Sequence, residues 1–169
     1  EHDAFVNFIA MLGWNDGTER ELFSMDDLIQ NFSIERVHKS GAKFNFDKAL
    51  WFNQQYLHLK PDTELANSIR MDLLARNSML TEDFILLYAK LFKDRIRFRY
   101  ELKNVGSYLY EEVEEYDVET LKKKWNQDSM IQIENYIEVL EMADFNNVSE
   151  LESVTKTYLE SNSIGMGAF

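Results

Sequence analysis

The chain has 169 residues, a formal net charge of −12, and 45% hydrophobic residues. This length allows one domain of ordinary size or two small ones, and the composition is typical of a folded protein with a real core. Because there is no cysteine, the sequence excludes disulfides, a thiolate nucleophile and a cysteine zinc site, and is compatible with a reducing cytoplasm; its longest apolar run, 84–89, is too short to span a membrane.

The acidity is concentrated in the last third of the sequence. Residues 1–60 carry a net charge of −3, residues 61–103 carry +1, and residues 104–169 carry −10. This asymmetry points weakly to an anionic partner for the middle part of the chain. The short acidic run at 111–115 is interpreted as a solvated loop or helix end.

The first part of the chain is predicted as short helices. Apolar residues recur at helical spacing from Phe5 to Leu12, and Gly13 ends this helix. A turn is predicted at 15–18. Ser24 followed by Asp27 predicts a capping-box start for a second helix.

The block 37–46 is the part of the sequence that does not follow a helical pattern. A turn is predicted at 39–41, and Phe44 and Phe46 alternate as in a short strand. Asp47 is the predicted cap of the helix that follows. These features predict a small mixed α/β element before Pro61.

From the single proline, Pro61, onward the pattern is helical, and we take Pro61 as the main candidate boundary. We predict caps at Thr81, Asp117 and Ser149. The fold class is therefore predicted to be mainly α, with helices at 62–76, 81–103, 117–143 and 149–161.

A basic and aromatic segment stands out at residues 89–102 of this acidic chain. It contains five cations interleaved with Phe92, Phe98 and Tyr100. On a wheel drawn for a continuous helix, one face is predicted as the core stripe and the opposite face as ordinary solvated surface. The stripe contains Phe84, Leu87, Leu91, Phe98 and Leu102, and the opposite face contains Lys90, Lys93 and Arg97.

Arg95 falls near the middle of the predicted apolar stripe, where an unpaired charge would be costly. Two interpretations remain open. Arg95 forms a structural ion pair with a neighbouring helix, or it lies at the mouth of a groove facing an anionic or planar ligand. Arginine suits the second task because its flat guanidinium pairs with phosphates and base edges, and neighbouring rings offer stacking surfaces for unpaired bases.

Other chemistry has little support in the sequence. His2, His38 and His58 show no metal-ligand spacing, no phosphate-binding loop pattern is present, and the glycines near 165–167 lack its strand and helix context. Paired carboxylates such as Asp26 and Asp27 are interpreted as helix-start residues. The residues alone therefore indicate a binding or structural module without catalytic or metal-binding residues.

Several strings carry a family resemblance. They include Leu12-Gly13-Trp14, Phe23-Ser24, the block 39–44 (Lys-Ser-Gly-Ala-Lys-Phe) and the block 51–56 (Trp-Phe-Asn-Gln-Gln-Tyr). In this order and spacing they resemble bacterial glutamyl-tRNA synthetases, downstream of the catalytic core. The block 93–97 (Lys-Asp-Arg-Ile-Arg) resembles the basic helix of that family, and the end of the chain looks closest to Bacteroidetes-type enzymes.

The resemblance implies a C-terminal fragment of such an enzyme, because the HIGH-type and KMSKS-type motifs of its adenylating site are not in these residues. It implies a stem-contact region at 1–60, a first anticodon-binding helical domain at 61–116 and part of a second at 117–169. The parent enzyme would activate glutamate with ATP and Mg²⁺ and attach it to tRNA-Glu. The fragment itself is predicted to be catalytically inactive, cytoplasmic, monomeric, and without membrane, DNA or cofactor.

The resemblance also selects candidate RNA-binding residues, with a structural alternative for most of them. Arg95 is the leading candidate. Lys39 and Lys43 are phosphate contacts or plain loop charges, and Asn53 and Tyr56 contact RNA or brace the domain junction, whereas Trp14 and Trp51 are predicted as core aromatics. The full predicted set is Arg95, Arg97, Arg99, Lys93, Lys39, Lys43, Asn53 and Tyr56. The competing hypothesis is a helical protein–protein module that docks a basic partner on its acidic last third.

Overall fold

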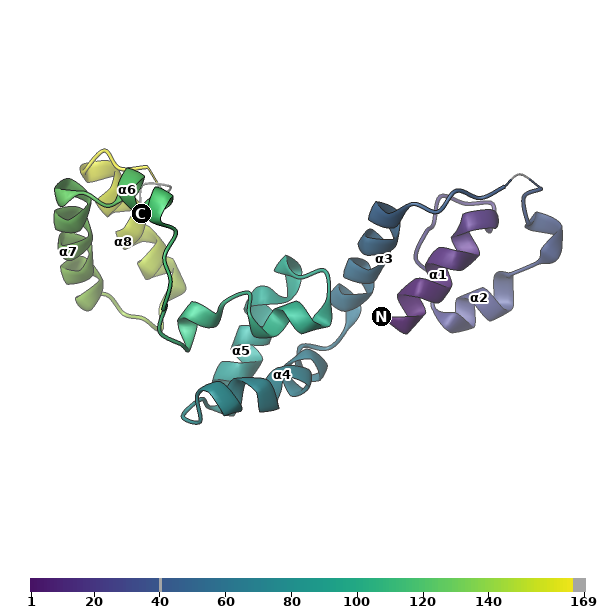
Figure 1. The fold of residues 1–169 in the computed structure, drawn as a ribbon, viewed down its shortest axis with the longest axis horizontal. Helices are drawn as coiled ribbons and strands as arrows, with labels where there is room; N and C mark the ends of the chain where they lie inside the picture. Colours follow the sequence, from purple (N-terminus) through teal and green to yellow (C-terminus); the bar gives the residue numbers. More distant parts are fainter. Residues whose placement is uncertain (40, 166–169) are drawn as a thin grey trace. The chain divides into compact units, whose positions relative to one another are not determined.

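The computed structural model describes residues 1–39 and 41–165 and divides the chain into two compact units, 1–112 and 113–169. All regular structure in the described residues is helical, which confirms the mainly α prediction. Figure 1 shows the course of the chain within each unit. The predicted division into three parts, with boundaries after residues 60 and 116, stays a prediction.

The first unit contains five α-helices and four short 3₁₀ helices in its described residues. Helix α1 packs against α3, and α4 packs against α5 (Figure 1). The elements are α1 (His2–Gly13), α2 (Met25–Asn31), η1 (Ile34–Arg36), α3 (Phe46–Leu59), α4 (Asp62–Arg76), α5 (Glu82–Phe92), η2 (Lys93–Arg95), η3 (Arg99–Lys103) and η4 (Ser107–Leu109).

Several predicted helix starts are confirmed. The Ser24 hydroxyl accepts a hydrogen bond from the Asp27 backbone N–H at 3.1 Å, while the Asp27 carboxylate accepts from the Ser24 backbone N–H at 3.0 Å. Thr81 caps α5 by accepting from the Phe84 N–H, and Pro61 is the N-cap of α4. These local signals were readable because each lies within four residues of its partner.

The predicted strand in the block 37–46 is wrong for the residues that the structure describes. Residues 41–45 have no regular structure, and Phe46 already begins α3, whose cap is Asn45 and not Asp47. The Phe44 ring instead packs edge-on against Phe8 at 5.1 Å. A strand needs a neighbouring strand for its backbone hydrogen bonds, and the described residues offer none. The predicted turn at 39–41 includes Ser40, which lies outside the described residues.

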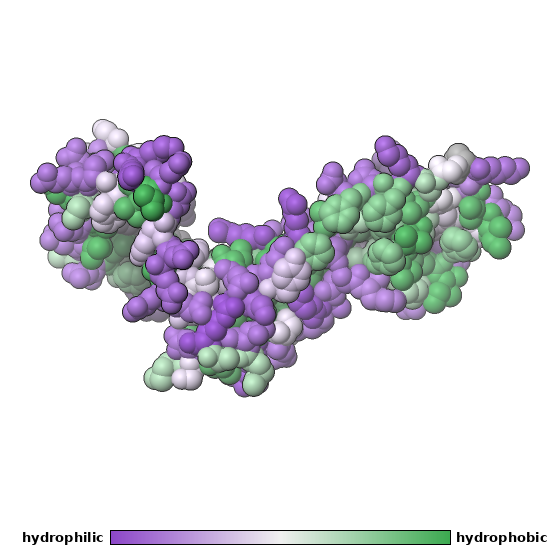
Figure 2. Space-filling model, viewed as in Figure 1, coloured by the Kyte–Doolittle hydropathy of each residue, from purple (hydrophilic) through white to green (hydrophobic). Residues whose placement is uncertain are grey.

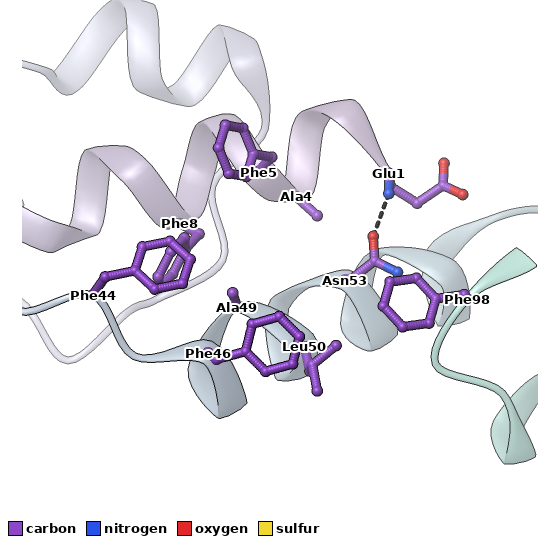
Figure 3. A pocket seen from close by; sticks show the side chains of 10 residues that line it. All are labelled: Glu1, Ala4, Phe5, Phe8, Phe44, Phe46, Ala49, Leu50, Asn53 and Phe98. Carbon is purple, nitrogen blue, oxygen red and sulfur yellow. Dashed lines mark hydrogen bonds between the residues drawn. The ribbon is translucent and has the colours of Figure 1, made fainter.

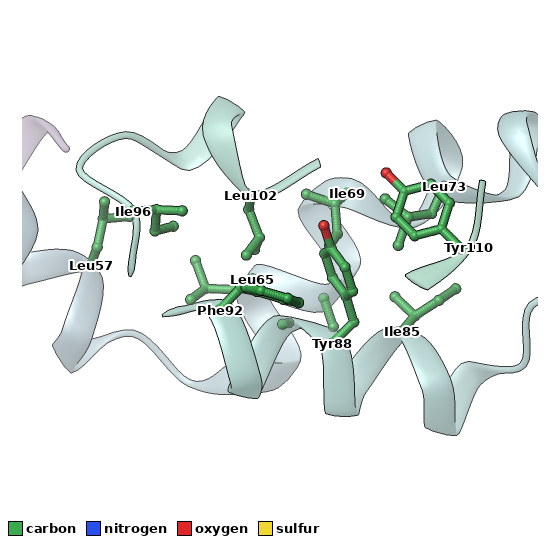
Figure 4. Close-up of a cluster of buried hydrophobic side chains, with 12 residues drawn as sticks. Leu57, Leu65, Ile69, Leu73, Ile85, Tyr88, Phe92, Ile96, Leu102 and Tyr110 are labelled. Carbon is green, nitrogen blue, oxygen red and sulfur yellow. The ribbon is translucent and has the colours of Figure 1, made fainter. Parts of the chain in front are cut away.

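The core of the first unit lies mainly between α4 and α5. Figure 4 shows its side chains converging there, with Leu57 added from α3 and Tyr110 from the end of the unit. On α5 the buried positions are Ile85, Tyr88, Ala89 and Phe92. The predicted core stripe through Leu87 and Leu91 is therefore wrong, since both of these side chains are more than half exposed.

A second core joins α1 to α3 and to the segment before α2. Trp14 is fully buried against Phe23 with ring centroids 5.6 Å apart, as predicted for a core aromatic. Trp51 is half-buried, and the Lys48 ammonium lies 4.5 Å from its ring centroid. Figure 2 shows hydrophobic surface gathered over the helices α1 and α3, where Phe5, Phe44 and Phe46 are exposed.

The second unit contains α6 (Val118–Lys124), α7 (Gln127–Glu141) and α8 (Val148–Ser161), with α7 packed against α8. The continuous helix predicted for 117–143 is wrong, because α6 ends before Trp125 and the Asn126 side chain caps α7. Asp117 caps α6 as predicted, but α8 is capped by Asn147 instead of Ser149. In both missed cases the cap is an asparagine. Asn126 lies inside the stretch predicted as one helix, and Asn147 lies two residues before the predicted cap. Each side chain accepts a hydrogen bond from a backbone N–H in the first turn of its helix.

Candidate nucleic-acid interface

The candidate interface is built on residues 93–103, which we call the basic segment. The helix predicted for 81–103 stops at Phe92, and the segment continues as η2, an irregular stretch at 96–98 and η3. Ile96 is fully buried, while Arg95 at the end of η2 and Arg97 after Ile96 are exposed.

Two side chains, those of Asn53 and Glu101, hold the backbone of Arg97 and Phe98 in place. The Asn53 amide of α3 donates to the Arg97 carbonyl at 2.6 Å. The Glu101 carboxylate of η3 accepts from the backbone N–H groups of Arg97 at 2.7 Å and Phe98 at 3.1 Å. Charge-assisted bonds to backbone donors are among the stronger hydrogen bonds in proteins. The backbone that carries Arg97 is therefore held in one position while its guanidinium stays exposed.

Arg95 does not lie within an apolar stripe, as the helical wheel had placed it. Its guanidinium lies 5.6 Å from the ring centroid of Phe92 and is exposed to solvent. Within the described residues no carboxylate forms an ion pair with Arg95 or Arg97. The alternative of a structural ion pair for Arg95 therefore finds no partner there.

Arg95 and Arg97 border an open hollow of about 530 Å³. Ile96 and Val105 contribute apolar lining, Tyr100 contributes an aromatic ring, and Glu101 contributes a carboxylate already bonded to backbone N–H groups. Two free guanidinium groups beside an aromatic ring are suited to a phosphate or a planar polar ligand.

Arg99 has a different environment from its two neighbours. Its guanidinium pairs with the Glu1 carboxylate at 2.9 Å and with the Glu64 carboxylate at 3.0 Å, and Lys60 lies 3.3 Å from Glu64. The hydrogen bond from Arg99 lowers the pKa of Glu64, more than burial raises it. These contacts join α1, α4 and the basic segment, so they favour a structural function for Arg99.

Lys93 and Tyr56 also use their polar atoms within the protein. The Lys93 ammonium donates to the Lys60 carbonyl at 2.5 Å and to Asp62 at 2.9 Å, and its side chain is only 15% exposed. The Tyr56 hydroxyl lies 2.5 Å from the Phe23 carbonyl oxygen and 2.9 Å from Asn7 Oδ1. Both side chains brace neighbouring elements.

Lys39 and Lys43 lie on the connection between η1 and α3, away from the basic segment in the sequence. Both side chains are exposed, and neither has an ion pair among the described residues. Of the eight predicted residues, Arg95 and Arg97 line one hollow, Asn53 and Arg99 line another, and Asn53 also bonds to the Arg97 carbonyl. Tyr100 was not among the predicted residues, although its place inside the basic and aromatic string was a usable signal.

An apolar hollow of about 260 Å³ lies between α1, α3 and residues 44–46 (Figure 3). Figure 3 shows the rings of Phe5, Phe8, Phe44, Phe46 and Phe98 around it. It is apolar, and the one charged residue among those lining it is Glu1. This hollow therefore lacks the cations expected at a phosphate-binding surface.

Over residues 1–39 and 41–165, no group of three His, Asp or Glu side chains could hold a metal ion. Within the same ranges, no helix has the length and apolar character required to cross a membrane. The candidate interface itself offers guanidinium groups, an aromatic ring and backbone polar groups.

Comparisons with known proteins agree with a tRNA-related module. Residues 54–169 match the family described as "Anticodon binding domain". Over 165 residues the chain is 36% identical to the glutamate–tRNA ligase of Parabacteroides distasonis, and over 167 residues it is 38% identical to that of Flavobacterium psychrophilum. Each match covers 98% of this chain and 33% of the relative, so the chain spans about a third of the length of these enzymes.

Solved structures give the same result. The crystal structure of a glutamate tRNA ligase from Elizabethkingia meningosepticum in complex with its amino acid is similar with a TM-score of 0.81 and 31% identity, over 98% of this chain and 33% of that one. The fold and these matches thus define a helical domain of the aminoacyl-tRNA synthetase class. More particularly, the chain belongs to the anticodon-binding domain family, in the form found in glutamate–tRNA ligases.

Proposed function

We propose that the chain is the tRNA-binding part of a bacterial glutamate–tRNA ligase and that its basic segment contacts the anticodon loop. The main support is that Arg95 and Arg97 are exposed, lack ion pairs among the described residues, and border one hollow inside the matched range 54–169. Lys39 and Lys43 are proposed as phosphate contacts on the stem side. Asn53 supports the interface by holding the Arg97 backbone.

The rest of the reaction is proposed to lie outside this chain. Activation of glutamate with ATP and Mg²⁺, and its transfer to tRNA-Glu, would be carried out by the larger part of the enzyme that these relatives possess. The chain alone is proposed to be a catalytically inactive, cytoplasmic monomer. Light scattering of the purified chain checks the monomer.

The proposal is tested by the salt dependence of binding between the chain and a tRNA-Glu transcript. About three to five phosphate contacts should give a log–log slope of about −2 to −4 between affinity and salt. The competing hypothesis, an acidic surface that docks a basic partner, predicts no tRNA binding and salt-sensitive binding of a basic protein instead. Equal affinity for tRNA-Glu and for an unrelated polyanion would contradict the proposal.

Arg95→Ala provides the residue-level prediction for this function. If its guanidinium contacts a base, the variant should lose about 1–3 kcal/mol of tRNA binding and should discriminate less between anticodons. The matched control is Lys90→Ala, which removes an exposed cation from the neighbouring helix α5. Filter binding with cognate and anticodon-substituted transcripts measures both effects; unchanged selectivity in a folded Arg95→Ala variant would contradict the base contact.

A further inference from the structure

The residue Tyr100 is exposed, and its ring is stacked on the ring of Phe98. Tyr100 is 64% exposed, so its ring is not part of the core of the first unit. The rings of Phe98 and Tyr100 are stacked, with centroids 5.5 Å apart and an interplanar angle of 15°. The Tyr100 ring is thus stacked on Phe98 while most of the residue stays exposed.

Tyr100 also lies beside the two exposed arginines of the basic segment. Tyr100 lines two hollows, the one of about 530 Å³ with Arg95 and Arg97, and another of about 430 Å³ with Phe98 and Lys103. Phe98 lines the second hollow and not the first. Tyr100 therefore borders the hollow of Arg95 and Arg97, to which Phe98 does not contribute.

The two hollows also differ in whether their cations are paired with carboxylates. In the second hollow Lys103 lies 3.5 Å from Asp72, and Arg99 is paired with Glu1. In the first hollow Arg95 and Arg97 have no such partners among the described residues. An anionic chain is thus attracted to the hollow that Tyr100 shares with Arg95 and Arg97.

From this geometry we infer that Tyr100 is a stacking platform for one unpaired base of an RNA loop, whose flanking phosphates are held by Arg95 and Arg97. The inference rests on the proposed function and specifies the ligand as a nucleobase in single-stranded RNA. Aromatic rings bind unpaired bases through their flat faces with little dependence on which base is present. Base identity would then be read by the guanidinium groups, and Tyr100 would supply affinity and hold the base in place.

The test uses the full chain and a tRNA-Glu transcript, in which each anticodon-loop nucleotide in turn is replaced by an abasic nucleotide. Tyr100→Ala should weaken binding of the intact transcript by about 5- to 150-fold, the range expected for loss of one base–aromatic stack. Tyr100→Phe should bind as the wild type does, because the ring face is kept. At one abasic position the difference between wild type and Tyr100→Ala should disappear, since the stacked base is already missing.

The possible outcomes separate this inference from the proposed function. If wild-type chain does not bind the transcript, both are overturned. If it binds and Tyr100→Ala binds equally well, only the stacking platform is overturned. If Tyr100→Phe is as weak as Tyr100→Ala, or if the loss persists at every abasic position, a hydroxyl or phosphate contact replaces the stacking explanation. Tyr100→Leu, which keeps apolar contact with Phe98 but has no aromatic face, should behave as Tyr100→Ala does and guards against a folding defect.

Discussion

At the scale of single residues, Gly106 shows how closely the first unit is packed. A Cβ atom on Gly106 would lie 2.2 Å from Cζ of Phe92, and the Phe92 ring is itself fully buried. The φ of −135° is open to other residues, so the requirement for glycine is steric and not conformational. Gly106 thus determines how closely the chain after η3 can approach α5.

Gly106→Ala is therefore expected to lower the free energy of unfolding by about 1–3 kcal/mol, because an overpacked core must shift side chains or backbone. Chemical denaturation measured by circular dichroism gives this value. Gly41→Ala is the control, since a Cβ there meets no atom within 4 Å and φ is not positive. Equal stability of the two variants would contradict this description of the core.

Tyr88, whose hydroxyl oxygen accepts a hydrogen bond from the Gly106 N–H, gives a pH-dependent prediction. Burial raises the pKa of Tyr88 to about 12, although its hydroxyl oxygen accepts a hydrogen bond from the Gly106 N–H at 3.0 Å. Because the folded state favours the neutral phenol, the stability that Tyr88 contributes is fully present below pH 10 and is lost as the pH rises through about 12.

Tyr88→Phe should therefore unfold more easily at neutral pH, by about 1–3 kcal/mol for the unpaired Gly106 N–H, and should lose less further stability between pH 10 and 12. Urea midpoints across this pH range measure both effects. A variant with the same alkaline slope as wild type would assign that slope to other groups, such as Tyr56 and Tyr110, whose pKa values burial also raises.

At the scale of elements, the basic segment depends on Glu101 for its shape. Glu101→Ala removes the acceptor for the Arg97 and Phe98 N–H groups at the start of η3. Loss of such a cap should cost about 0.5–2 kcal/mol of stability. It should also weaken tRNA binding, although a negative charge has been removed, because Arg97 is no longer held. Denaturation and filter binding measure the two effects.

Glu112→Ala, which removes an exposed carboxylate outside the segment, is the control for this prediction. Tighter tRNA binding by both variants would show that charge alone matters.

At the scale of the whole molecule, the two units differ in how much core they bury. The cores containing Trp14, Phe52 and Tyr88 all lie within residues 1–112. In the described part of the second unit, the buried side chains are those of Ser129, Tyr158 and Leu159. Apolar burial is the dominant stabilising contribution, so the second unit should open more readily.

Hydrogen exchange tests this difference. Amides of α6, α7 and α8 should exchange about ten-fold or more faster than those of α4 and α5, since one factor of ten corresponds to about 1.4 kcal/mol of opening free energy. Mass spectrometry of peptides from the intact chain gives both rates in one experiment. Equal protection of α4 and α8 would mean that the two units unfold as one cooperative body.

Local signals in the sequence determined much of this protein. Capping residues such as Ser24 and Thr81 fixed helix starts, and the strings around Trp14 and Trp51 indicated the family, because these features depend on residues close together in the chain. Tertiary contacts decided the interface. Asn53, 44 residues away from Arg97, holds the Arg97 carbonyl, and Ile96 is buried in the core while Arg95 and Arg97 stay exposed. A helical wheel cannot contain such contacts, because it assumes that the backbone continues unchanged.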